Sequence, residues 1–193
     1  MTPIVYVHPR AFETMIRASI ERFKKECLGH IFGREYKKPR PYFIITDASP
    51  LQSVKTKNQE VEASKRSDLR LRDFFSRMPT HARPIGYFHS HTEYGNVAFS
   101  AEMSEHDKED MMREKSKLEF IIAISSRKRG VVPWNQQPEG NIKGSFSGAR
   151  YNYNLDIHAY IPASEEDAPS AVRIKIVAPR AVEEFNRALK YRT

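Results

Sequence analysis

The spacing of apolar residues along the chain predicts strands interspersed with helices. Apolar residues recur at helical spacing over residues 10–24 and form one stripe, which predicts an amphipathic helix. Residues 151–161 alternate between apolar and polar positions, as a half-buried strand does. Further strands are expected at residues 4–7, 26–33, 42–48, 84–91, 118–125 and 171–178, and further helices near residues 59–78, at 105–116 and from Pro179 onward. The predicted class is therefore α/β or α+β.

Two stretches break this pattern and are expected to be insertions. Residues 49–68 are largely polar, and residues 126–148 contain repeated Gly and Pro, which favour irregular structure. The last strand and helix are expected to form a C-terminal extension. A length of 193 residues suits one domain, so a single domain over residues 1–193 with these insertions is predicted.

Composition narrows the range of functions. Cys27 is the one cysteine, so an internal disulfide and a cage of several thiolates are both excluded, and a reducing cytoplasm is the expected compartment. No apolar run approaches the roughly 18 residues needed to span a bilayer, so no membrane partner is expected. The formal net charge is +8, but the basic clusters are scattered and do not interleave with aromatic residues as a base-stacking surface would. A solvated basic surface is therefore favoured over a nucleic-acid site.

The most specific local feature is His89-Ser90-His91, at the end of the strand predicted at residues 84–91. Side chains alternate across a strand, so the two histidines share one face and Ser90 points to the other. Their Cα atoms should lie roughly 6.5 Å apart, close enough for two imidazoles to converge on one metal ion. Such a pair alone is a weak signal, because most His-x-His strands bind no metal.

A third ligand is expected from another element. A catalytic zinc commonly has three protein ligands and keeps its fourth position for water. Asp107 lies in the first turn of the helix predicted after Ser104, from where it can reach a metal held by the preceding strand. Ser at the N-cap with Asp in the first turn is also an ordinary helix start. A base must serve the water as well, and spacing alone does not choose it among the many acidic residues.

With these residues in view, the sequence resembles the JAMM (MPN+) family of zinc metallopeptidases. The family pattern is a Glu opening a glycine-containing strand, His-x-His on a later strand, and Ser-x-x-Asp at a helix start. Here these elements read KECLGHIFG, GYFHSHT and SEHD, and the resemblance covers roughly residues 4–125. It implies a single MPN-type (cytidine-deaminase-like) domain, in which helices flank a mixed central sheet.

The resemblance also implies roles for individual residues. One Zn²⁺ per chain would be held by His89, His91 and Asp107, with Glu26 as general acid/base and Ser104 as a donor to the oxyanion. The implied activity is removal of ubiquitin or a ubiquitin-like modifier from proteins by hydrolysis of an isopeptide bond. The implied partners are that modifier and its conjugates, with the proteasome or a second copy of the chain as further candidates.

Two departures from the family pattern affect the assignment. Thr92 stands where the family usually has Pro, and the segment 92–103 between the second His and Ser104 is longer than usual. Choosing Ser100 instead would put Met103 where the carboxylate is needed, so Ser104 and Asp107 are preferred and 92–103 is interpreted as an enlarged loop. Glu102 is the next candidate for the carboxylate ligand. The alternative function is a non-catalytic MPN scaffold that binds partners.

Overall fold

The structure is a computed structural model that describes residues 2–52, 54–57, 60–63, 65–77, 83–93, 100–127, 130–148, 150–163 and 169–190. The helices are α1 (Pro9–Glu21), α2 (Lys65–Arg77), α3 (Glu105–Arg113) and α4 (Pro179–Lys190). The strands are β1 (Ile4–Val7), β2 (Leu28–Tyr36), β3 (Tyr42–Pro50), β4 (Val54–Lys57), β5 (Glu60–Ala63), β6 (Arg83–Thr92), β7 (Leu118–Arg127), β8 (Asn135–Gln136), β9 (Ile142–Ser147), β10 (Asn152–Pro162) and β11 (Ala171–Val177). Within the described ranges, none of the helices combines the length and apolar composition that crossing a bilayer requires.

Nine strands form one sheet in the order β11-β1-β3-β2-β6-β7-β10-β9-β8. The pairs β1–β11, β1–β3 and β6–β7 are parallel, whereas β2–β3, β2–β6, β7–β10 and β9–β10 are antiparallel. The C-terminal part of β10 also pairs with β11, which joins the two ends of the series β11-β1-β3-β2-β6-β7-β10. These seven strands therefore form a closed β-barrel.

The closed barrel corrects the predicted fold class. Strands account for 45% of the structure and helices for 27%, and the sheet is not the open mixed sheet flanked by helices that the MPN-type prediction required. The physical reason lies in β11, which pairs with β1 on one edge and with β10 on the other. The alternation of Ala171–Val177 marks it as a strand, but hydrophobic periodicity does not encode which strands it pairs with.

The segment 126–148 also differs from its prediction as an irregular insertion. It contains β8 and β9, and β9 pairs with β10 along Ile142–Ser147. Gly144, one of the glycines that suggested a loop, lies within β9 beneath the indole of Trp134. A Cβ at this position would come within 2.2 Å of the Trp134 ring. The glycine is therefore required by packing rather than by a turn.

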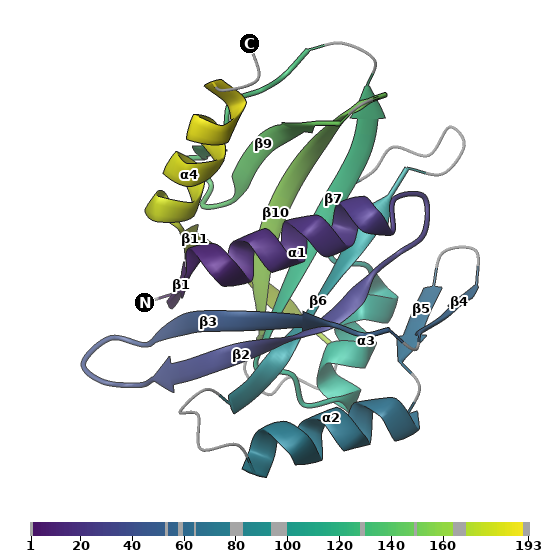
Figure 1. Ribbon diagram of the computed structural model, residues 1–193. Coiled ribbons are helices and arrows are strands. Elements are labelled where there is room, and N and C mark those ends of the chain that lie inside the picture. The colour runs from purple at the N-terminus through teal and green to yellow at the C-terminus, as the bar shows by residue number, and fades with distance from the viewer. Residues whose placement is uncertain are drawn as a thin grey trace.

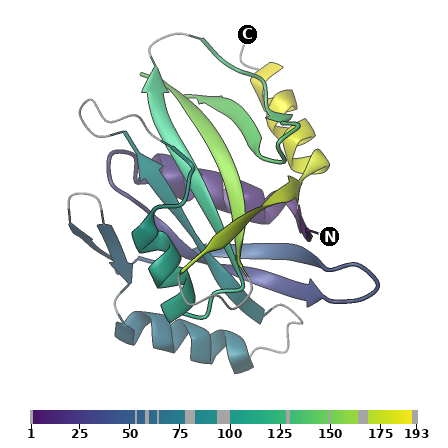
Figure 2. The ribbon, with the colours of Figure 1, turned by 180° about the vertical axis from the view of Figure 1, so that it is seen from behind.

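Helices α1 and α3 lie on opposite faces of β6 and β7 (Figures 1 and 2). The main core lies on the α1 face, where Phe12 and Met15 meet Phe88 and Phe120. Trp134, which lies in the segment 126–148, is 2% exposed and lies among these core residues. A second, smaller apolar cluster lies on the α3 face and consists of Ala101, Met103, Met111, Ile121, Ala123 and Tyr160.

Candidate metal centre

Strand β6 presents His89 and His91 on the face covered by α3. Its alternation places Phe88 in the main core and directs Ser90, which is fully buried, toward the backbone N–H of Cys27 at 2.9 Å. Gly86 allows β6 to pack closely against β7, because a Cβ there would lie 1.7 Å from the carbonyl oxygen of Leu118. These contacts fix the position of β6. Because successive side chains of a strand point to opposite faces, the imidazoles of His89 and His91 then lie on the same face.

Helix α3 begins beside these imidazoles and supplies the carboxylate. Ser104 is the N-cap, and its Oγ accepts a hydrogen bond from the Asp107 N–H at 3.1 Å. Asp107 Oδ2 in turn accepts from the Ser104 N–H at 2.8 Å and from the Ser104 hydroxyl at 2.6 Å. The capping box that starts the helix therefore also fixes the rotamer of Asp107.

The three side chains converge on one point. The two Nε2 atoms of His89 and His91 are 3.1 Å apart. Asp107 Oδ1 lies 3.3 Å from His89 Nε2, and Asp107 Oδ2 lies 3.4 Å from His91 Nε2. A tetrahedral zinc with bonds of about 2.0–2.1 Å separates its ligand atoms by roughly 3.4 Å. Among the described residues, this is the group that could hold a metal ion, and its geometry fits zinc.

Hydrogen bonding gives His91 the protonation state that a metal ligand needs. His91 Nδ1 lies 2.8 Å from the backbone carbonyl oxygen of Ser100. Because a carbonyl only accepts, Nδ1 must carry a proton, which leaves Nε2, on the side of His89 and Asp107, as the nitrogen that a metal ion would take in place of a proton. The backbone at Ser100 is thus a supporting contact of the kind that orients metal-bound histidines.

The electrostatics of the cluster favour a cation. Burial opposes ionisation of Asp107, but hydrogen bonds from His89 and His91 outweigh burial and hold the pKa of Asp107 well below its usual range. Burial acts to lower the pKa of His91, but Asp107 beside it raises that pKa above its ordinary value. A nearby carboxylate favours positive charge on these imidazoles, and a divalent cation would satisfy the same preference.

Glu26 precedes β2 by two residues and lies near the cluster. In the β2–β6 register Leu28 pairs with His89, and the Ser90 N–H donates to the Cys27 carbonyl at 3.0 Å. Continuing this register places Glu26 opposite His91 and on the same face. The charge of Glu26 also contributes to raising the pKa of His91. Cys27 alternates to the α1 face, where it is 3% exposed and burial raises the pKa of its thiol.

Neither a family model nor a curated protein sequence matches the chain. Among solved structures, the chain is similar to the solution structure of protein DSY2949 from Desulfitobacterium hafniense. The TM-score is 0.56 at 15% sequence identity, and the match covers 91% of this chain and 92% of the other. At this identity the similarity extends to the fold alone.

Glu102, the next candidate for the carboxylate ligand, and Met103, which the rejected alignment through Ser100 would place there, have other contacts. Met103 is 9% exposed and packs in the smaller apolar cluster. Glu102 lies beside Tyr160 and Arg173, at 3.2 Å and 3.3 Å, rather than beside the two imidazoles. The single hydroxyl proton of Ser104 is directed to Asp107, so the structure shows Ser104 as a support for that carboxylate. Residues 94–99 of the predicted loop lie outside the described residues.

Sequence reasoning missed two features of this region. The Ser100 carbonyl carries no side-chain signal, because any residue could supply it. Glu119 on β7 is 5% exposed, and burial raises its pKa to about 8, with a smaller contribution from the charge of Asp107. A buried, protonated carboxyl therefore lies near the acidic side chains of α3. Residues 118–125 (LEFIIAIS) are mostly apolar, so their pattern gave little reason to expect such a group.

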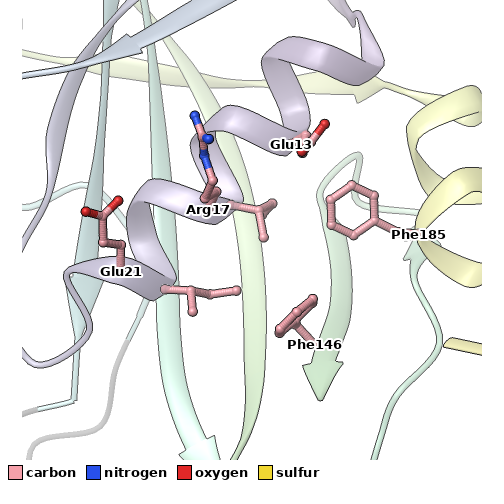
Figure 3. A pocket seen from close by; sticks show the side chains of 7 residues that line it. Glu13, Arg17, Glu21, Phe146 and Phe185 are labelled. Atoms are coloured by element: carbon pink, nitrogen blue, oxygen red, sulfur yellow. The ribbon is translucent and has the colours of Figure 1, made fainter. Parts of the chain in front are cut away.

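The groove shown in Figure 3 lies elsewhere and contains none of the predicted site residues. It has a volume of about 410 Å³ and lies between α1, β9 and α4. Its lining consists of Glu13, Ile16, Arg17, Ile20, Glu21, Phe146 and Phe185. The lining is mainly apolar, although Glu13, Arg17 and Glu21 border it, and the candidate chemistry stays with the cluster on β6 and α3.

Proposed function

We propose that this protein is a zinc-dependent peptidase that hydrolyses amide bonds, with His89, His91 and Asp107 as the metal ligands. The observation that carries the proposal is the convergence of their ligand atoms at 3.1–3.4 Å. Glu26 on the same face adds a carboxylate where a hydrolytic site needs a base. The resemblance to JAMM peptidases is a resemblance of this site and does not extend to the MPN-type sheet.

Zinc bound at this cluster would supply a Lewis acid that lowers the pKa of a water molecule and polarises the scissile carbonyl. Glu26 accepts a proton as the water oxygen bonds to the carbonyl carbon. Glu26 then delivers that proton to the amine nitrogen as the C–N bond breaks. Asp107, fixed by Ser104, and His91, fixed by the Ser100 carbonyl, keep the ligand set in place. The predicted role of Ser104 as an oxyanion donor requires its hydroxyl to turn from Asp107 toward substrate.

For the substrate, we propose a lysine isopeptide bond to ubiquitin or a ubiquitin-like modifier. The support is the motif resemblance of residues 26–33, 86–92 and 104–107. The basic surface of the chain suits an acidic modifier. The buried thiol of Cys27 is consistent with the cytoplasm as the proposed compartment.

The test is a hydrolysis assay on the full chain loaded with one equivalent of zinc. Modifier fusions joined through a lysine side chain and through a linear peptide bond would be incubated with and without a chelator. The expected result is cleavage of the lysine-linked fusion that the chelator stops and added zinc restores. Stoichiometric zinc without cleavage of any fusion would favour the non-catalytic scaffold, and the absence of bound zinc would refute the metal site itself.

A further inference from the structure

One short segment, residues 100–104, contacts both His91 and Asp107. The Ser100 carbonyl accepts from His91 Nδ1 at 2.8 Å, and Ser104 holds Asp107 Oδ2 through two hydrogen bonds. The segment itself is compact, since the Glu102 N–H donates to Ser100 Oγ at 3.0 Å. The position of this segment therefore sets the position of two of the three predicted zinc ligands.

Tyr160 on β10 holds the 100–104 segment in place through a hydrogen bond and apolar contacts. Its hydroxyl donates to the Ala101 carbonyl at 2.9 Å, and its ring packs with Ala101 and Met103 in the smaller apolar cluster. The Tyr160 side chain is 4% exposed, so water cannot readily replace that hydrogen bond. Burial and the neighbouring Glu102 raise the pKa of Tyr160, which keeps the hydroxyl protonated as a donor.

A row of polar side chains on β10 and β11 fixes Tyr160 in turn. His158 Nδ1 lies 3.1 Å from the Tyr160 hydroxyl, and His158 Nε2 lies 3.2 Å from Asp156 Oδ1. Arg173 on β11 lies 3.3 Å from Glu102 Oε1 and thereby ties the same segment to the closing strand of the barrel. His158 is 5% exposed, so the row connects the buried His158 and Tyr160 to Glu102 and Arg173 at the surface.

We infer that Tyr160 is a positioning residue for the metal centre, which acts through the Ala101 carbonyl to hold the Ser100 carbonyl against His91. This inference rests on the proposed zinc site, because it assigns Tyr160 a role in the preorganisation of that site. The chain of contacts runs from β10 through the 100–104 segment to β6. Closure of the barrel between β10 and β11 is thus connected physically to the geometry of the ligands.

The experiment compares wild type with Tyr160→Phe, which keeps the ring and removes only the hydroxyl. The matched control is Tyr153→Phe on the same strand, whose ring packs against Phe23 on the α1 face. Zinc affinity would be measured by competition with a chelator, and Co²⁺ absorption would report the coordination geometry. Thermal unfolding of the metal-free proteins would report any general loss of stability. We expect about tenfold weaker zinc binding and an altered Co²⁺ spectrum for Tyr160→Phe, with neither change in the control.

Two negative outcomes are distinguishable. If the wild type binds no zinc, the proposed function fails and the positioning role fails with it. If the wild type binds one zinc and Tyr160→Phe has the same zinc affinity and Co²⁺ spectrum, the metal site stands and the positioning role is overturned. Tyr160→Met, which also removes the hydroxyl but keeps an apolar side chain at this buried position, provides a second variant should Tyr160→Phe not fold. A weakened zinc affinity in Tyr160→Met supports the inference, and an unchanged affinity counts against it.

Discussion

Two polar clusters lie on the α3 face of the barrel, and only one has the geometry of a metal site. In the first, the ligand atoms of His89, His91 and Asp107 face one another at 3.1–3.4 Å. In the second, His158 lies between Asp156 and Glu102, with one carboxylate near each ring nitrogen. Because the two nitrogens of an imidazole point in different directions, the second set cannot share one ion.

The difference shows what a metal centre requires beyond residue type. Both clusters contain histidine and carboxylate, and the histidines of both are largely buried. Residues 89 and 91 bring two separate imidazoles to one face, and the N-terminus of α3 brings a carboxylate from a different element. A single imidazole with a carboxylate on each side instead forms a row of hydrogen bonds, which stabilises structure and positions neighbours.

The largest expected effect is the loss of zinc on removal of a ligand. His89→Ala should weaken zinc binding roughly a thousandfold, since each ligand supplies several kcal/mol of a total of about 10–16 kcal/mol. His106→Ala is the control, because His106 is exposed and its nearest carboxylate is Asp110 at 3.8 Å. Isothermal titration with Zn²⁺ measures both. If His89→Ala bound zinc as tightly as wild type, the first cluster would not be the metal site, and the two clusters would no longer differ in that respect.

The next effect separates catalysis from metal binding within the first cluster. Glu26→Gln should lower kcat roughly 10²–10⁴-fold, because the amide cannot accept the proton from water. It should retain one zinc per chain. Glu109→Gln on the exposed side of α3 is the matched control and should leave both quantities unchanged. Turnover at the wild-type rate by Glu26→Gln would refute its assignment as the acid/base.

The buried carboxyl of Glu119 provides a test of how the stability of this region depends on pH. The register partner of Glu119 on β10 is Tyr160. The native pKa of Glu119, about 8, lies above the ordinary value of 4.5, so the folded state binds more protons than the unfolded state between these values. Stability should therefore fall as pH rises from 4.5 to 8. Glu119→Gln removes this loss and should gain roughly 2–4 kcal/mol relative to wild type between pH 5 and pH 9.

Urea unfolding of the metal-free proteins at several pH values measures this difference. Glu139→Gln, at an exposed position, controls for the removal of one carboxylate. Parallel pH profiles for wild type and Glu119→Gln would show that the Glu119 carboxyl is not buried as described.

The smallest expected effect concerns the second cluster. His158→Gln should cost about 1–3 kcal/mol of stability, since it disturbs the hydrogen bonds to Asp156 and Tyr160. Wild type and variant should still bind one zinc each when the metal is saturating. Chemical unfolding and elemental analysis test the two statements separately. Loss of stoichiometric zinc from His158→Gln would mean that the second cluster supplies a ligand.

Much of the site could be predicted because its signals are local. The alternation of β6 orients His89 and His91, and the capping chemistry of Ser104 and Asp107 marks the start of α3. The identity of Glu26 depended on the motif resemblance, because no spacing rule selects it among the acidic residues. The Ser100 carbonyl could not be predicted, since a backbone acceptor leaves no trace in the sequence.

The fold was predicted less well, because strand partners and close contacts depend on residues that are far apart in the sequence. Two places in the structure show this. Most strands were predicted from the local pattern of apolar residues, but closure depends on β11 pairing both with its neighbour β10 and with β1, which lies at the other end of the chain. The second place is Gly144, where a loop signal proved to be a packing requirement of Trp134. Partners and close approaches are properties of the folded chain, and local periodicity does not carry them.

The central claim is that two imidazoles and one carboxylate hold a single zinc. Zinc-edge X-ray absorption on the purified full chain tests it most directly, because nitrogen or oxygen neighbours at about 2.0–2.2 Å differ from sulfur at about 2.3 Å. The account predicts one zinc per chain with only nitrogen and oxygen neighbours and with imidazole scattering. A sulfur neighbour, which could come only from Cys27 or a methionine, or the absence of stoichiometric zinc would contradict it.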